Sequence, residues 1–117
     1  MGRDYAEVSG RIRAVCEGED DAVALMATVA CELYQAFDDF DWVGFYRVTA
    51  PDLLKIGPYQ GGHGCLTIPF ARGAGRLIAV LDVDSDTPAA FDAADADTLE
   101  ALMAGIFGTR TDGMTRE

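Results

Sequence analysis

Residues 41–65, DWVGFYRVTAPDLLKIGPYQGGHGC, decide which fold this chain adopts. Large apolar and aromatic residues recur there at every second position, which is the period of a β-strand, and the TAPD turn separates two such runs. We therefore predict two strands, over residues 42–48 and 53–59, joined by a short turn.

Two further strands are expected downstream. CLTIPF at residues 65–70 is predicted as an edge strand or a strand end, because Pro69 has no N–H to donate to a neighbouring strand. LIAVLDVDS at residues 77–85 is predicted as a central strand, because its first residues are apolar on both faces. The ARGAGR segment between them is typical of a turn.

Apolar residues at steps of three and four predict three helices, the first over residues 3–16 and the second over residues 20–37. Asp92 is expected to cap the third helix, with Asp95 in its first turn, and Gly108 to end it. The predicted buried stripes are Tyr5, Val8, Ile12 and Val15 in the first helix; Val23, Met26, Val29, Ala30, Leu33, Tyr34 and Phe37 in the second; and Leu99, Leu102, Met103 and Ile106 in the third.

The order of two helices, four strands and one helix predicts an α+β fold, with a mainly antiparallel sheet and helices packed on a face. A length of 117 residues is enough for one domain and too short for two. We expect a single domain over residues 1–108 and a polar tail over residues 109–117.

The composition limits the classes of function. Nine Lys and Arg residues against 20 Asp and Glu residues give a net charge of −11, which argues against nucleic acid and anionic membranes as partners. No apolar run is long enough to cross a bilayer and the N-terminus lacks a secretory signal, so a cytoplasmic location is expected. Three widely spaced cysteines and one histidine suggest neither a disulfide framework nor a zinc site, and we expect no metal or other cofactor.

The first strand carries a feature that could bind a ligand. Trp42, Gly44 and Tyr46 share one strand face, so two rings flank a position without a side chain. Such a slot suits a thin apolar or sulfur-bearing group. The ordinary alternative, which the spacing alone favours, is that aromatic residues prefer strands and that the glycine lets a helix pack closely.

Two carboxylates follow the buried part of the last strand. Asp82 and Asp84 share a face and could hold the ammonium group of a ligand, cap a turn or raise one another's pKa. Alternatively, they simply mark a strand end that opens into solvent, where charge costs little.

The cysteines differ in their surroundings. Cys65 follows the GGHG run and could be a reactive thiol whose pKa is lowered by His63, or an inert cysteine beside a flexible turn. Cys16 and Cys31 fall in the predicted helices, where we expect them to act as small buried or half-buried apolar residues.

The segments DWVGFY, LLKIGPYQG, CLTIPFARG, LIAVLDVDS and FDAADADTLEAL resemble, in order and wording, the free methionine-(R)-sulfoxide reductases, which are single-domain enzymes of the GAF fold. The resemblance extends from about the first helix to Phe107. It implies reduction of the R-sulfoxide of free methionine by a cysteine thiolate, which becomes a sulfenic acid. A second cysteine then forms a disulfide, which thioredoxin reduces.

The resemblance also implies roles for individual residues. Trp42 and Tyr46 match aromatic residues that line the methyl-sulfoxide pocket. Asp82 and Asp84 match acids near the substrate, with Asp84 as the partner of its amino group. Cys65 matches a cysteine that serves as the resolving thiol.

The chain departs from the family pattern between Gly73 and Ala74. At this point the family has a long segment that contains a GVCG helix start and another strand or two. The same segment carries a loop with the attacking cysteine and a glutamate that contacts the substrate. Three interpretations remain open: an inactive or nearly inactive reductase, a reductase in which Cys65 itself attacks the sulfoxide, or a degenerate GAF module that binds a ligand or partner without catalysis. Because the deletion removes neighbours of the last strand, we expect either GCLTIPF to pair with that strand as a hairpin or a second copy to pair there in a homodimer.

Overall fold

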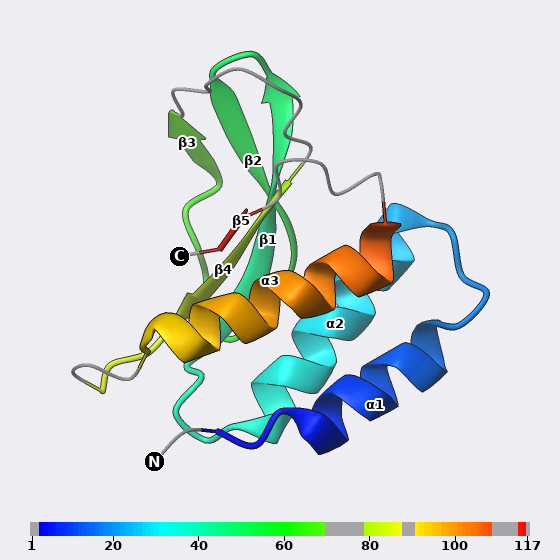
Figure 1. The fold of residues 1–117 in the computed structure, drawn as a ribbon. Coiled ribbons are helices and arrows are strands. Elements are labelled where there is room, and N and C mark those ends of the chain that lie inside the picture. The colour runs from blue at the N-terminus through cyan, green and yellow to red at the C-terminus, as the bar shows by residue number, and fades with distance from the viewer. Residues whose placement is uncertain (1–2, 70–78, 88–90, 109–114, 117) are drawn as a thin grey trace.

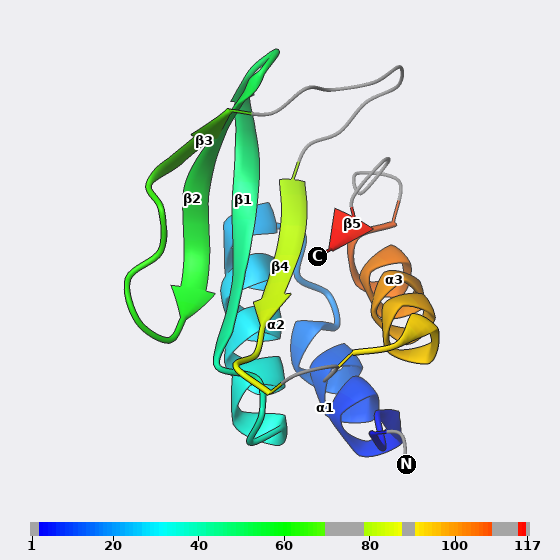
Figure 2. The same ribbon diagram turned by 90° about the vertical axis from the view of Figure 1, so that its left-hand side faces the viewer.

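The structure, a computed structural model, describes residues 3–69, 79–87, 91–108 and 115–116. Its elements in chain order are α1 (Ala6–Cys16), α2 (Ala22–Ala36), β1 (Trp42–Ala50), β2 (Leu53–Gln60), β3 (Thr67–Pro69), β4 (Ala79–Asp84), α3 (Ala93–Phe107) and β5 (Thr115–Arg116). The strands form a sheet in the order β3-β2-β1-β4-β5, antiparallel except between β4 and β5. The three helices of the described residues lie on one face of this sheet (Figures 1 and 2), which confirms the predicted α+β architecture.

The stretch over residues 41–65 forms the pair of strands that its alternation predicts. β1 and β2 are antiparallel neighbours, from Ala50 opposite Leu53 beside the turn to Val43 opposite Gln60 at the far end. β4 pairs with the other edge of β1, so β1 is flanked on both sides and its backbone is enclosed in the sheet.

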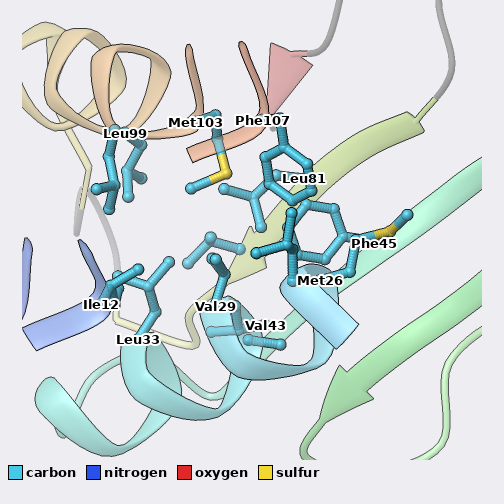
Figure 3. Close-up of a cluster of buried hydrophobic side chains, with 14 of the residues drawn as sticks. Ile12, Met26, Val29, Leu33, Val43, Phe45, Leu81, Leu99, Met103 and Phe107 are labelled. Carbon is cyan, nitrogen blue, oxygen red and sulfur yellow. The ribbon is translucent and has the colours of Figure 1, made fainter. Parts of the chain in front are cut away.

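The core lies between the sheet and the helices. Val43 and Phe45 of β1 and Leu81 and Val83 of β4 point toward the helices and are at most 2% exposed. Figure 3 shows how this layer meets side chains of the helices, such as Met103 of α3. Alternate residues of the same strands must therefore point to the opposite face of the sheet, which is referred to below as the outer face.

Most of the predicted helix stripes are buried, but Val15 and Val23 are 59% and 55% exposed and their placement in the core was wrong. In α2 the buried face is centred on Leu25, Val29 and Leu33, each at a step of four residues. Val23 lies at the margin of that face and faces solvent. In α1, Cys16 takes the buried position in the last turn in place of Val15.

The start of α3 confirms the predicted cap. The Asp92 carboxylate accepts a hydrogen bond from the Asp95 N–H at 3.0 Å, and the Asp95 carboxylate accepts one from the Asp92 N–H at 3.0 Å. This reciprocal pair satisfies N–H groups that the first turn of a helix leaves without an internal partner. Gly108 ends the helix with a φ of +62°, as predicted.

The predicted hairpin between GCLTIPF and the last strand is wrong. β3 pairs with β2, with Thr67 opposite Lys55 and Pro69 opposite Leu53, while β4 pairs with β1. The short connection after Gln60 returns the chain along the open edge of β2, which is its nearer partner in sequence. The predicted strand ends at residues 70 and 77–78 lie outside the described residues.

Most of the predicted polar tail over residues 109–117 also lies outside the described residues. Thr115 and Arg116 form β5, which runs parallel to β4 opposite Val80 and Leu81. Within the described residues, no helix is both long and apolar enough to span a membrane.

Candidate functional site

The register of the sheet brings the four predicted substrate-binding residues onto its outer face. Trp42 of β1 lies opposite Asp84 of β4, and Gly44 lies opposite Asp82. Directly opposed residues point to the same side of a sheet, and Tyr46 lies two residues beyond Gly44 on that side. Their helix-facing neighbours fill the core, so these side chains point away from the helices.

The rings form the centre of a second apolar cluster, separate from the core. Trp42 and Tyr46 are only 8% and 5% exposed, although no helix of the described residues lies on their side of the sheet. The indole stacks on Tyr46 at 5.9 Å between ring centroids and on Tyr59 of β2 at 5.3 Å. The other members are Val48, Leu54, Ile56, Ile68 and Val80.

The predicted open slot over Gly44 is filled. A Cβ added at Gly44 would lie 2.5 Å from the Cβ of Tyr59 and closer still to the indole of Trp42. The indole therefore folds back over Gly44, and the glycine is needed because the ring occupies the space of a side chain. The floor of the slot exists as predicted, but its occupant in this structure is Trp42 itself.

Both acids lie near the phenol of Tyr46. Asp82 is half-buried and Asp84 is exposed. The pKa of Tyr46 is raised, first by its burial and then by its proximity to Cys65, Asp82 and Asp84. The outer face thus combines apolar rings with nearby carboxylates.

Cys65 reaches the same place through the segment that links β2 to β3. Its backbone N–H lies close enough to the Tyr46 hydroxyl to lower the pKa of that phenol, and its thiol is free and exposed. His63, two residues earlier, is also exposed. The structure therefore brings Cys65 together with the predicted substrate-binding residues.

The other two cysteines lie on the helix side of the sheet, as small buried or half-buried residues, and the prediction for them is confirmed. Cys16 of α1 is buried, and its burial, followed by Glu19 and Glu32, raises the pKa of its thiol. Cys31 of α2 is half-buried and accepts a hydrogen bond from the Gln35 amide at 3.0 Å. Neither thiol shares the outer face with Cys65.

Sequence reasoning missed Tyr59 and the tight packing of the glycines that follow it. Tyr59 ends the LLKIGPY strand, and its alignment opposite Gly44 is what places a third ring on the outer face. This alignment depends on an irregularity in the pairing of β1 and β2 between Gly44 and Tyr46, which alternation of residue types does not reveal.

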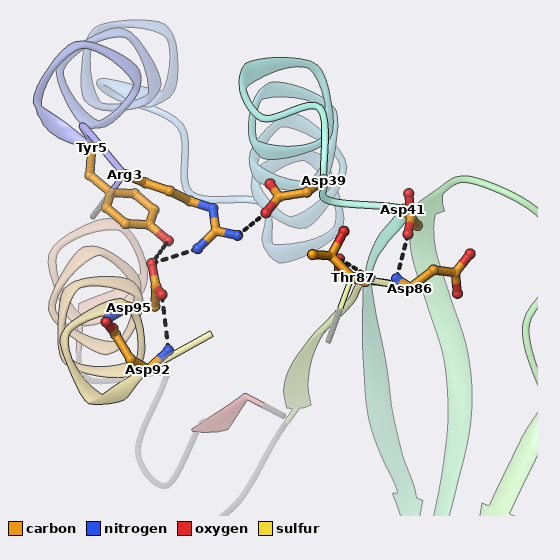
Figure 4. Close-up of polar contacts among 9 residues, drawn as sticks. Arg3, Tyr5, Asp39, Asp41, Asp86, Thr87, Asp92 and Asp95 are labelled. Carbon is orange, nitrogen blue, oxygen red and sulfur yellow. Dashed lines mark hydrogen bonds and ion pairs between the residues drawn. The ribbon is translucent and has the colours of Figure 1, made fainter. Parts of the chain in front are cut away.

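A separate polar cluster on the helix side ties the N-terminus to α3 (Figure 4). Arg3 bridges the carboxylates of Asp39 and Asp95, and the Tyr5 hydroxyl donates to Asp95 at 2.7 Å. Burial alone would raise the pKa of Asp95, but hydrogen bonds from Tyr5, the Asp92 N–H and Arg3 lower it below its ordinary value. This cluster has a structural role, since all of its charged groups face one another.

Within the described residues, no group of acidic, histidine or cysteine side chains could hold a metal ion.

Comparison with known proteins identifies relatives. No model of a protein family matches the sequence. The solved structure of free methionine-R-sulfoxide reductase from Neisseria meningitidis, in complex with its substrate, is 33% identical; the match covers 95% of this chain and 92% of that chain, with a TM-score of 0.79. Free methionine-R-sulfoxide reductase of Escherichia coli is 36% identical over 69 residues, which are 59% of this chain and 41% of that protein.

Protein YtsP of Bacillus subtilis is 27% identical in a match that covers 87% of this chain and 92% of that protein. This match extends over 150 positions, more than the 117 residues of the chain, so the relative has residues that this chain lacks inside the matched region. Solved GAF domains share the fold, with TM-scores of 0.76 and 0.79. The chain therefore has the GAF fold and belongs to the free methionine-(R)-sulfoxide reductase family.

Proposed function

We propose that this chain binds free L-methionine-(R)-sulfoxide, or a similar small amino acid, on the outer face of its sheet and reduces it with the thiol of Cys65. The observation that carries the proposal is the gathering of Trp42, Tyr46, Asp82, Asp84 and Cys65 on one face, from three separate segments of the chain. The relative from Neisseria meningitidis supports it, since that protein was solved with its substrate.

Each part of such a ligand has a matching group. The rings of Trp42 and Tyr46 offer an apolar contact for the S-methyl end, because sulfur and methyl groups pack well against aromatic rings. Asp84 is exposed and carries the charge that an ammonium group requires. Asp82 lies opposite Gly44, between the positions of the two rings, where it would orient the ligand, whereas Asp84 lies opposite Trp42.

An external dithiol, thioredoxin, supplies the two electrons that the proposed reaction consumes. The Cys65 thiolate attacks the sulfoxide sulfur, the S–O bond breaks as oxygen passes to Cys65 and takes up a proton from solvent, and methionine leaves while Cys65 becomes a sulfenic acid. One thiol of thioredoxin displaces the hydroxyl group as water and forms a mixed disulfide, and its second thiol then releases Cys65. The sulfoxide gains two electrons and thioredoxin loses two. Because Cys16 and Cys31 lie on the other side of the sheet, a direct encounter of Cys65 with thioredoxin is required.

A second candidate is ligand binding without turnover. The resemblance implies that the attacking cysteine of the family belongs to the segment that this chain lacks, and Cys65 corresponds to a resolving thiol. The space over Gly44 is also filled by Trp42 in this structure. Both observations favour a domain that holds the amino acid but reacts with it slowly or not at all.

One assay separates these functions. Free L-methionine-(R)-sulfoxide, thioredoxin, thioredoxin reductase and NADPH are mixed with the protein, and the loss of NADPH is followed. The reductase proposal expects turnover that Cys65→Ser abolishes and that Cys31→Ser, the matched control on the helix side, preserves. Calorimetric binding without turnover supports the second candidate, and Asp84→Asn should then weaken it about tenfold, the size of one charge-assisted hydrogen bond. If the protein shows no binding and no turnover, both functions are excluded.

A further inference from the structure

The segment Gly61–Cys65, named here the glycine strap, lies directly on the aromatic cluster of the outer face. The indole Nε1 of Trp42 donates a hydrogen bond to the Gly62 carbonyl at 2.9 Å. Gly61 has a φ of +118°, and a Cβ at this position would lie 2.8 Å from Cδ1 of the same indole. Figure 1 shows the connection from β2 to β3 on the side of the sheet away from the helices.

Gly64 packs against both Trp42 and Tyr46. A Cβ at this position would lie 2.9 Å from Cζ2 of Trp42, 3.0 Å from Cδ1 of Ile56 and 3.2 Å from the Tyr46 hydroxyl. Real Cβ atoms essentially never come within 3.0 Å of another heavy atom, so only glycine fits there. By contrast, a Cβ at Gly62 would meet nothing within 4 Å.

The strap explains why the rings are so poorly exposed, although the helices in the described part of the chain all lie on the other face of the sheet (Figure 2). Trp42 lies beneath the Gly62 carbonyl, and Tyr46 lies beneath Gly64 and the N–H of Cys65. Asp84 and Cys65 remain exposed at the rim. The polar and reactive groups of the proposed site are therefore open, whereas the apolar contacts for the S-methyl end are covered.

We infer that the glycine strap is a built-in competitor: it occupies the place of the ligand on the Trp42–Tyr46 rings and has to move before the ligand binds. This inference rests on the proposed function. Binding would exchange the strap's contacts on the indole for contacts with the ligand. The apparent affinity of such a site is reduced by the fraction of molecules in which the strap is open. Weakening the closed strap should therefore tighten binding without any new contact to the ligand.

The matched pair Gly64→Ala and Gly62→Ala tests this directly. The first places a methyl group against the ring of Trp42, and the second places the same group in open space. Trp42 is the single tryptophan of the chain, so quenching of its fluorescence by acrylamide reports how well the strap covers it. Without ligand, we expect stronger quenching in Gly64→Ala than in the wild type, and wild-type quenching in Gly62→Ala.

Calorimetric titration with free L-methionine-(R)-sulfoxide then measures the competition. If the strap is closed in 90–99% of molecules, Gly64→Ala should bind about 10- to 100-fold more tightly than the wild type and Gly62→Ala. Equal affinities of the three proteins would overturn the competitor role while leaving the proposed function intact. Absence of binding to all three, including Gly64→Ala, would overturn the proposed function and the inference together.

A second measurement covers the case in which Gly64→Ala folds poorly. In the wild type with saturating ligand, amide hydrogen exchange of the strap residues should become faster, because the ligand displaces the strap from the rings. Slower exchange of the same amides would mean that the ligand binds beneath or beside a closed strap, and this result would contradict the inference.

Discussion

At the scale of single residues, Gly44 is the position at which one added methyl group should cost most. The indole of Trp42 and the Cβ of Tyr59 already fill the space above it. Gly44→Ala would force the ring from its stack or push β2 from β1, and overpacking of this kind costs about 1–3 kcal/mol. We expect the free energy of unfolding, measured by urea denaturation, to fall by this amount.

Gly10→Ala is the control for this substitution. Gly10 lies in the middle of α1, and a Cβ there would meet nothing within 4 Å. Since alanine is the better helix former, this variant should be more stable than the wild type by about 0.5–1 kcal/mol. Opposite signs for the two variants are expected, and a Gly44→Ala protein as stable as the wild type would show that the indole does not rest on the glycine.

The sequence was sufficient to place Trp42, Gly44 and Tyr46 on one face, because a period of two fixes the side of each residue locally. It did not reveal that the indole folds over the glycine. The conformation of that ring depends on Tyr59 and on the glycine strap, which reach it through strand pairing and through a loop. Contacts between distant segments of this kind are not encoded in the spacing of one strand.

At the scale of elements, the N-terminal segment is held against α3 by Arg3, Tyr5 and Asp95. Asp95→Asn removes the buried charge that pairs with the Arg3 guanidinium, which should lower the free energy of unfolding at pH 7 by about 1.5–3 kcal/mol. The pKa of Asp95 is depressed in the folded state, so its stabilising effect is present above the unfolded pKa and is lost as pH falls through the folded value. The difference between wild type and variant should therefore shrink below about pH 4.

Asp97→Asn provides the matched control, since Asp97 lies on the same helix and is exposed. Its effect on the free energy of unfolding should stay within about 0.5 kcal/mol at every pH. Urea denaturation of the three proteins between pH 3 and pH 7 measures both effects. A constant gap between wild type and Asp95→Asn across this range would mean that the carboxylate does not titrate in the way its partners require.

The type of the three helices and of β1 to β4 could be predicted, whereas β5 and the partner of β3 could not. Helix stripes, the Asp92 cap and strand alternation are local signals, and the structure confirms them except at Val15 and Val23. The pairing of β3 with β2 depends on how the glycine strap turns the chain after Gln60. A sequence rich in glycine permits many turns, so the pattern left that choice undetermined.

At the scale of the whole molecule, the edge of β4 that faces away from β1 is paired over only part of its length among the described residues. Among the described residues, β5 is the strand beside that edge, and it aligns with Val80 and Leu81. A strand edge with backbone groups available is a template for association. We propose that two copies of the chain pair through β4 and that the tail, residues 109–117, competes with this pairing. We also propose that residues 1–108 form the folding domain.

Removal of residues 109–117 tests these proposals together. The truncated chain keeps Gly108, whose N–H hydrogen-bonds to the Ala104 carbonyl and ends α3, so it should unfold cooperatively like the full chain. It loses β5, so its dimer should be tighter, with a larger fraction of dimer at each concentration in sedimentation velocity. Reductant must be present because the exposed thiol of Cys65 could link chains covalently. An unfolded truncated chain would refute the domain boundary. If both the full and the truncated chain sediment as monomers at every concentration, the association through β4 is refuted.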